Sequence, residues 1–145
     1  MKVKELVRHL ESIAPPSYQE GYDNAGLITG DYNWEISGVI TCLDSTEAVI
    51  EEAIAKGCNV VVAHHPIVFK GLKRFNGNNY VERVVIKAIQ HNIAIYAIHT
   101  NLDNVYHNGV NAKIAEKLQL EGTKILAPKK AVLKLVAYVP AGESD

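Results

Sequence analysis

The chain has 145 residues, of which 48% are hydrophobic and 21% are charged, and its formal net charge is -1. A chain of this length can bury a sizeable core as one globular domain. The near-neutral charge gives no reason to expect nucleic acid or an anionic membrane as a partner, and no apolar run reaches the length of a membrane span. Cys42 and Cys58 lack a CxxC spacing and stand among apolar residues, which predicts reduced cysteines and a cytoplasmic location.

The first predicted element is an amphipathic helix at the N-terminus, and the residue pair Pro15-Pro16 ends it. Its apolar positions follow helical spacing: Val3, Leu6, Val7, Leu10 and Ile13. A polar loop follows. Short apolar and β-branched runs then predict strands over 27–29 and 39–42.

A second helix is predicted after these strands, with Asp44 or Ser45 as its cap and with Gly57 at the position after the helix that favours glycine. Its apolar face holds Val49, Ile50, Ala53 and Ile54. A strand is predicted over 60–63. A clear apolar stripe then predicts a third helix over 81–89.

The last predicted elements are a strand over 93–98 and a helix over 110–118. This alternation of strands and helices predicts an α/β fold, with a mainly parallel or mixed sheet covered by helices on both faces. Strand order does not follow from the pattern. We expect residues 1–125 to form the α/β unit and residues 126–145 to form a linker with a strand over 133–140 that opens a further domain, so that the chain is a truncated piece.

Two polar motifs follow two of these predicted strands. Ala63-His64-His65-Pro66 comes directly after Val60-Val61-Val62, and a stretch from His99 to Asp103 follows the strand over 93–98. Ligands of α/β sheets bind outside the carboxyl ends of the strands. The sequence therefore predicts a metal site at one edge of the sheet, built from His64, His65 and Asp103 with His99 close by.

The residue types in these motifs suit zinc, iron or manganese better than calcium or magnesium. Two adjacent imidazoles can serve two ions, or one ion and a water, and Asp103 can bridge two ions roughly 3.5–4 Å apart. Simpler interpretations stay open at this point. A His-His pair at a turn is often a surface or core feature, Asp103 can be a helix cap or turn residue, and His99 can be a buried histidine bonded to the backbone.

Two loops offer further candidates. Asp23 and Asn24 lie beside glycines, where such residues usually form a plain turn, but either side chain could reach the site and orient a substrate or a ligand. Lys70, Lys73 and Arg74 could meet a phosphate, although a solvated basic loop is the ordinary alternative. The sequence has no phosphate-binding GxxxxGK[ST], no dinucleotide-binding GxGxxG and no GxSxG nucleophile motif.

At these residues the sequence resembles the NIF-three-like family, whose members are often labelled type 2 GTP cyclohydrolase I homologues. The resemblance runs through most of the chain and rests on five motifs in one order: Tyr22-Asp23-Asn24-Ala25-Gly26-Leu27, Leu43-Asp44-Ser45-Thr46, Ala63-His64-His65-Pro66, Phe69-Lys70-Gly71-Leu72-Lys73 and His99-Thr100-Asn101-Leu102-Asp103. Several motifs in a fixed order are far more specific than any one of them.

The resemblance implies a site for two divalent metal ions in a pocket between two similar α/β halves. His64, His65 and Asp103 would be ligands, and His99 would lie close by, either supporting a ligand from behind or acting in catalysis. The family adds a histidine and a glutamate from a C-terminal half, and this chain has no counterpart to either. Tyr22 stands where the family usually has tryptophan, an exchange that keeps an aromatic ring.

The resemblance also implies that the chain is the N-terminal half of a long-form member, followed by the first strand of a small inserted domain. Family members typically assemble into hexameric rings, so the expected partner is another copy of the chain. The expected function is that of a metal-dependent hydrolase, in which a metal-activated water attacks the ring of a purine nucleotide. A metal-dependent phosphoesterase and a non-enzymatic, ring-forming metal-binding scaffold or regulatory protein are the alternatives.

Overall fold

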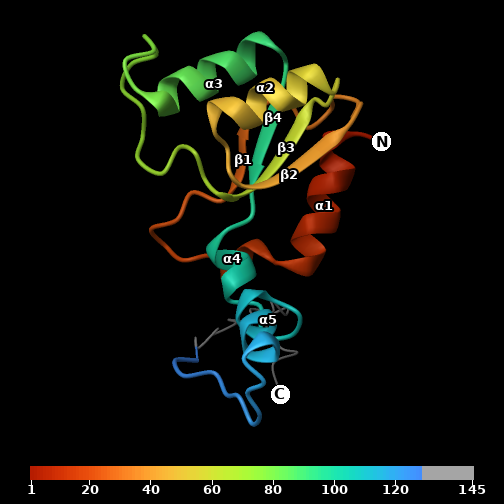
Figure 1. Cartoon of the computed structure of the whole chain (residues 1–145), viewed down its shortest axis with the longest axis vertical. Helices are drawn as coiled ribbons and strands as arrows, with labels where there is room; N and C mark the ends of the chain where they lie inside the picture. The colour runs from red at the N-terminus through yellow and green to blue at the C-terminus, as the bar shows by residue number, and fades with distance from the viewer. Residues whose placement is uncertain (129–145) are drawn as a thin grey trace, which may run out of the picture.

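The computed structural model of the chain describes residues 1–128, so the strand predicted over 133–140 lies outside the described residues (Figure 1). The elements, in chain order, are α1 (Val3–Ile13), the 3-10 turn η1 (Pro16–Tyr18), β1 (Gly26–Thr29), β2 (Val39–Asp44), α2 (Glu47–Ala55), β3 (Val60–His65), α3 (Tyr80–Gln90), β4 (Ala94–Ala97), α4 (Thr100–Asp103) and α5 (Val110–Lys117). No helix within residues 1–128 combines the length and apolar character that crossing a bilayer requires.

The four strands form one mixed sheet in the order β1-β4-β3-β2. Strands β2, β3 and β4 run parallel, and β1 pairs antiparallel with β4. The predicted α/β class with a mainly parallel or mixed sheet is therefore confirmed. Strands β1 and β2 are consecutive in the sequence but lie at opposite edges of the sheet. The pattern of hydrophobic residues does not predict this arrangement.

Helices cover both faces of the sheet, as predicted. Figure 1 shows α1 on one side and α2 with α3 on the other. Successive side chains of a strand point to opposite faces, so Val60 and Val62 pack in the cluster with α1, while Val61 packs in the cluster with α2 and α3. Strands β3 and β4 are thus buried on both sides, which holds the ends of these two strands in fixed positions.

Helix α2 begins one residue later than predicted. Its N-cap is Thr46, whose hydroxyl accepts a hydrogen bond from the backbone N–H of Val49 at 3.3 Å. The expected caps, Asp44 and Ser45, do not have this role, because Asp44 still belongs to β2. Gly57 follows the helix with a φ of +66°, the left-handed conformation that the sequence predicts there.

Replacing Thr46 with alanine should lower the free energy of unfolding by about 1 kcal/mol, because one amide at the start of α2 loses its hydrogen-bond acceptor. Urea denaturation followed by circular dichroism measures the change. Thr46→Ser retains the acceptor and serves as the matched control. Equal stability of the alanine and serine variants would contradict the capping role.

The one-turn helix α4 was not predicted, because four residues are too few to show helical periodicity. Asn101 holds it in place. Its side-chain carbonyl accepts the backbone N–H of His99 at 2.9 Å, and its buried amide donates to the carbonyl of Ala14 at 2.8 Å. Helix α5 follows, lies beyond α4 on the side away from the sheet, and contains no buried residue (Figure 1).

Candidate metal centre

Three histidines meet where β3 and β4 end. Ala63 pairs with Ala97 in the parallel register of these strands, so the residues that follow each of them emerge side by side. His64 and His65 are the last residues of β3, and His99 lies two residues beyond β4. Ligand atoms of these three histidines all lie within 4.8 Å of one another.

The three imidazole rings lie close together at steep angles and do not stack on each other. The ring centroids of His64 and His65 are 4.9 Å apart, and that of His99 lies 5.3 Å and 5.6 Å from them. His99 meets both other rings edge-on, at 76° and 88°. His64 and His99 are half-buried and His65 is exposed, so the cluster opens to solvent on one side.

Each imidazole is held through its Nδ1 atom by an oxygen that can only accept a hydrogen bond. For His64 the acceptor is the carbonyl of Ile98 at 3.0 Å. For His65 it is Asp44 Oδ1 at 2.8 Å, and for His99 it is Asp23 Oδ1 at 2.8 Å. Nδ1 must therefore carry the proton, and Nε2 keeps the lone pair that binds a cation. Histidines that bind metals in proteins are almost always oriented in this way.

Asp103 lies at the same edge of the sheet. It is the last residue of α4, and its Oδ1 atom is 3.6 Å from His64 Nε2. That separation is too long for a hydrogen bond, and it leaves both atoms available to a cation between them. The structure therefore brings together His64, His65 and His99, and it places Asp103, the predicted carboxylate ligand, next to His64.

Asp23 has a fully buried side chain and lies behind His99. Its Oδ2 atom accepts hydrogen bonds from the backbone N–H and the hydroxyl of Thr100. Burial by itself would raise the pKa of Asp23, but the hydrogen bonds from His99, Thr100 and the Asn24 amide outweigh burial and hold the pKa below the usual 3.8. An anionic carboxylate thus fixes the orientation of the His99 ring.

Asn24 has a different place from Asp23. Its side-chain amide donates to the backbone carbonyl of Val68 at 2.6 Å, which ties the loop before β1 to the segment after β3. The three basic side chains of that segment, Lys70, Lys73 and Arg74, are exposed. None of them belongs to the histidine cluster, which leaves their predicted role in phosphate binding as a prediction.

The role of Asp44 was missed in the sequence, where it was assigned to helix capping. In the structure it lies directly opposite His65 in the parallel pairing of β2 with β3. Because the two residues are direct neighbours across the strand pair, the Asp44 carboxylate reaches the His65 ring. The signal was present, since each residue follows a predicted strand by two positions, but using it required knowing that these two strands are neighbours.

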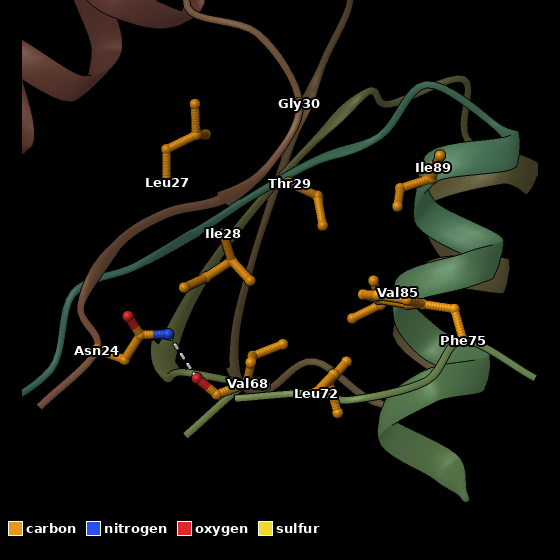
Figure 2. Close-up of a pocket in the computed structure, with 10 residues that line it drawn as sticks. All are labelled: Asn24, Leu27, Ile28, Thr29, Gly30, Val68, Leu72, Phe75, Val85 and Ile89. Carbon is orange, nitrogen blue, oxygen red and sulfur yellow. Dashed lines mark hydrogen bonds between the residues drawn. The ribbon is translucent and has the colours of Figure 1, made fainter. Parts of the chain in front are cut away.

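An apolar cavity lies apart from the histidine cluster. Its volume is about 470 Å³, and Figure 2 shows it between β1, α3 and the segment after β3. The lining is mostly apolar: Asn24, Leu27, Ile28, Thr29, Gly30, Val68, Leu72, Phe75, Val85 and Ile89. A second cavity, of about 330 Å³, adjoins the cluster and is lined by both Asp44 and His65.

Comparisons with known proteins agree with this architecture. The chain is 39% identical over 134 residues to a GTP cyclohydrolase 1 type 2 homolog of Clostridium acetobutylicum, covering 92% of this chain and 50% of that protein. A protein of the same name from Bacillus subtilis strain 168 is 40% identical over 139 residues, covering 94% of this chain and 37% of that protein. The chain thus spans half or less of the length of these curated relatives.

Solved structures are also similar to this chain over most of its length. A Bacillus cereus protein related to NIF3 superposes with a TM-score of 0.83 at 40% identity, covering 89% of this chain and 36% of that one. Reduced HcgD from Methanocaldococcus jannaschii gives a TM-score of 0.78 at 33% identity, covering 86% of this chain and 49% of that one. The model of the Duf34/NIF3 (NGG1p interacting factor 3) family matches residues 1–144. The resemblance seen in the sequence is thereby confirmed, and this chain belongs to the Duf34/NIF3 family.

Proposed function

We propose that the protein is a metal-dependent hydrolase in which His64, His65 and Asp103 hold one or two divalent cations. The observation that carries the proposal is the common orientation of the histidines, each with Nδ1 bonded to an oxygen acceptor. Fixing three imidazole rings beside a carboxylate costs conformational entropy, because each ring loses rotational freedom. A bound ligand would offset this cost.

The donor set favours zinc, iron or manganese. Imidazole nitrogen together with a carboxylate oxygen suits these ions, whereas calcium and magnesium prefer sites made of oxygen alone. The partial exposure of the cluster fits a catalytic site, in which a coordination position stays open to water or substrate. A pair of ions remains our proposal because adjacent imidazoles and a carboxylate able to bridge offer donors for two.

A bound divalent cation supplies a water nucleophile at neutral pH and stabilises negative charge on the substrate. The chain supplies the proton carrier, which we assign to His99. Its Nδ1–H is fixed on Asp23, so Nε2 can accept a proton from the nucleophile and return it to the leaving group. The buried negative charge of Asp23 stabilises the imidazolium that forms between these two transfers.

The proposed substrate is a purine nucleotide. The printed name of the curated relatives, GTP cyclohydrolase 1 type 2 homolog, points to GTP. The segment 70–74 carries three basic residues and no acidic one, which favours a ligand with phosphate groups. The same basic segment also fits a phosphoesterase, which is the second candidate function.

Turnover of GTP by the metal-loaded full-length protein tests the proposal. We expect hydrolysis with the wild type, loss of activity in His65→Ala, and normal activity in His91→Ala, a change at an exposed histidine at the end of α3. His99→Ala should retain metal but lose most turnover. Metal binding without turnover of any nucleotide or phosphoester in a panel would contradict the enzyme and support a metal-binding scaffold.

A further inference from the structure

Two exposed aromatic side chains lie beside the histidine cluster, and nothing in the proposed chemistry uses them. Tyr22 is 69% exposed and Phe69 is 49% exposed. Their ring centroids are 6.4 Å apart with the planes tilted by 59°, and the Phe69 ring lies 6.4 Å from that of His99, almost perpendicular to it. The three rings thus form a continuous series from solvent to the cluster.

The backbone holds both aromatic residues at this place. Tyr22 directly precedes Asp23, which is bonded to His99 and Thr100. Phe69 directly follows Val68, whose carbonyl accepts the side-chain amide of Asn24. The two loops are therefore fixed to each other and to the histidine cluster by hydrogen bonds, although the aromatic side chains themselves remain exposed.

Exposure alone does not distinguish these two rings, since Phe75 is also exposed; their position beside the histidine cluster does. We propose that Tyr22 and Phe69 form an aromatic platform on which a planar heteroaromatic ring of a ligand, such as a purine base, stacks beside the histidine cluster. The inference rests on the proposed function for what happens to the ligand afterwards, but ring binding is a separate property and can be measured without turnover.

The surroundings favour a small ring-bearing ligand over a protein partner. The two rings are tilted by 59° with their centroids 6.4 Å apart, and interacting aromatic rings keep centroid distances of about 4.5–7 Å. A base on Phe69 would therefore lie next to His99. Lys70 follows Phe69 directly, so a phosphate attached to that ligand would meet positive charge on the same segment.

Calorimetric titration of the metal-loaded full-length protein with guanosine monophosphate tests the platform, with ribose 5-phosphate as the probe that lacks a base. We expect the nucleotide to bind more tightly than the sugar phosphate. Tyr22→Ala and Phe69→Ala should each weaken nucleotide binding about 5- to 100-fold and leave sugar phosphate binding unchanged, the range typical of base stacking on aromatic side chains. Phe75→Ala, at another exposed phenylalanine 61% accessible to solvent, is the matched control and should bind like the wild type.

Tyr22→Trp gives a second readout. The variant keeps an aromatic ring, so it should bind the nucleotide as the wild type does, and its added tryptophan fluorescence should be quenched by the base. Native Trp34 packs against the core cluster around α1 and supplies the unquenched reference. If binding and quenching depend on the base but GTP is not turned over, the aromatic platform is supported and the proposed hydrolase function is contradicted.

Equal binding of both probes, unaffected by either alanine variant, would overturn the platform even if turnover is observed. A change in oligomeric state or melting temperature in Tyr22→Ala and Phe69→Ala, with nucleotide binding intact, would likewise overturn it. That result would show that the two rings are covered by another part of the protein or by another copy.

Discussion

Replacing His64 with alanine will weaken Zn²⁺ binding at least about 100-fold, the largest effect that we expect from any single change. Loss of an outer partner of a metal-binding histidine typically costs about 10- to 100-fold in affinity, so loss of a ligand nitrogen should cost no less. His64 is the residue that links the two parts of the site. Its Nδ1 is bonded to Ile98 beyond β4, and its Nε2 faces Asp103 from α4.

Competition with a chromogenic chelator measures the affinity, and elemental analysis measures the retained metal. The matched control is His91→Ala, which removes an imidazole from the exposed end of α3 and should bind like the wild type. Affinity of the wild type should also fall in acid, because the ligand nitrogens must be unprotonated to bind. Stoichiometric zinc in His64→Ala after chelator treatment would contradict the assignment of this ligand.

The histidines of the site could be predicted from the sequence because each follows a long apolar run. The residues 60–62 and 93–98 are almost entirely buried in the structure. When a buried strand has polar residues only at its carboxyl end, those residues must lie at that edge of the sheet, where solvent or a ligand can reach them. Neighbouring strands then bring two such ends together, and here β3 and β4 are neighbours.

The partners of these histidines could not be predicted in the same way, because they depend on strand order and loop paths. Asp44 reaches His65 since β2 happens to flank β3. Asp23 reaches His99 across 76 residues of sequence, through a loop without regular structure. No local pattern encodes either contact. Propensity therefore predicted that Asp44 caps a helix and that Asp23 forms a turn, and only the assembled fold shows what they orient.

The second large effect should come from Asp23→Asn, which keeps the shape of the side chain but removes its charge. We expect the free energy of unfolding of the metal-free protein to fall by about 1–3 kcal/mol at neutral pH, because a fully buried carboxylate that accepts several hydrogen bonds is replaced by a weaker acceptor. Turnover by the metal-loaded protein should fall about 100- to 10,000-fold, the contribution typical of a general acid or base, since the amide no longer fixes His99 in one tautomer.

The pH dependence of stability separates this effect from a simple packing change. The folded protein holds the pKa of Asp23 below the usual 3.8. The stabilisation that this carboxylate provides is therefore fully present above that pH and is lost as the pH falls through the folded value. The stability difference between wild type and Asp23→Asn should accordingly shrink as the pH falls below 3.8.

Two other aspartates serve as comparisons, with urea denaturation and GTP turnover by the metal-loaded protein as the measurements. Asp44→Asn alters the equivalent partner of His65, but that side chain is 58% exposed, so the loss of stability should be smaller than at Asp23. Asp31→Asn changes an exposed turn, where the carboxylate accepts the nearby amide of Asn33, and should leave both stability and turnover close to those of the wild type. If Asp23→Asn instead matched Asp31→Asn in both measurements, the buried carboxylate would have no part in orienting His99, and the assignment of that histidine as a proton carrier would lose its basis.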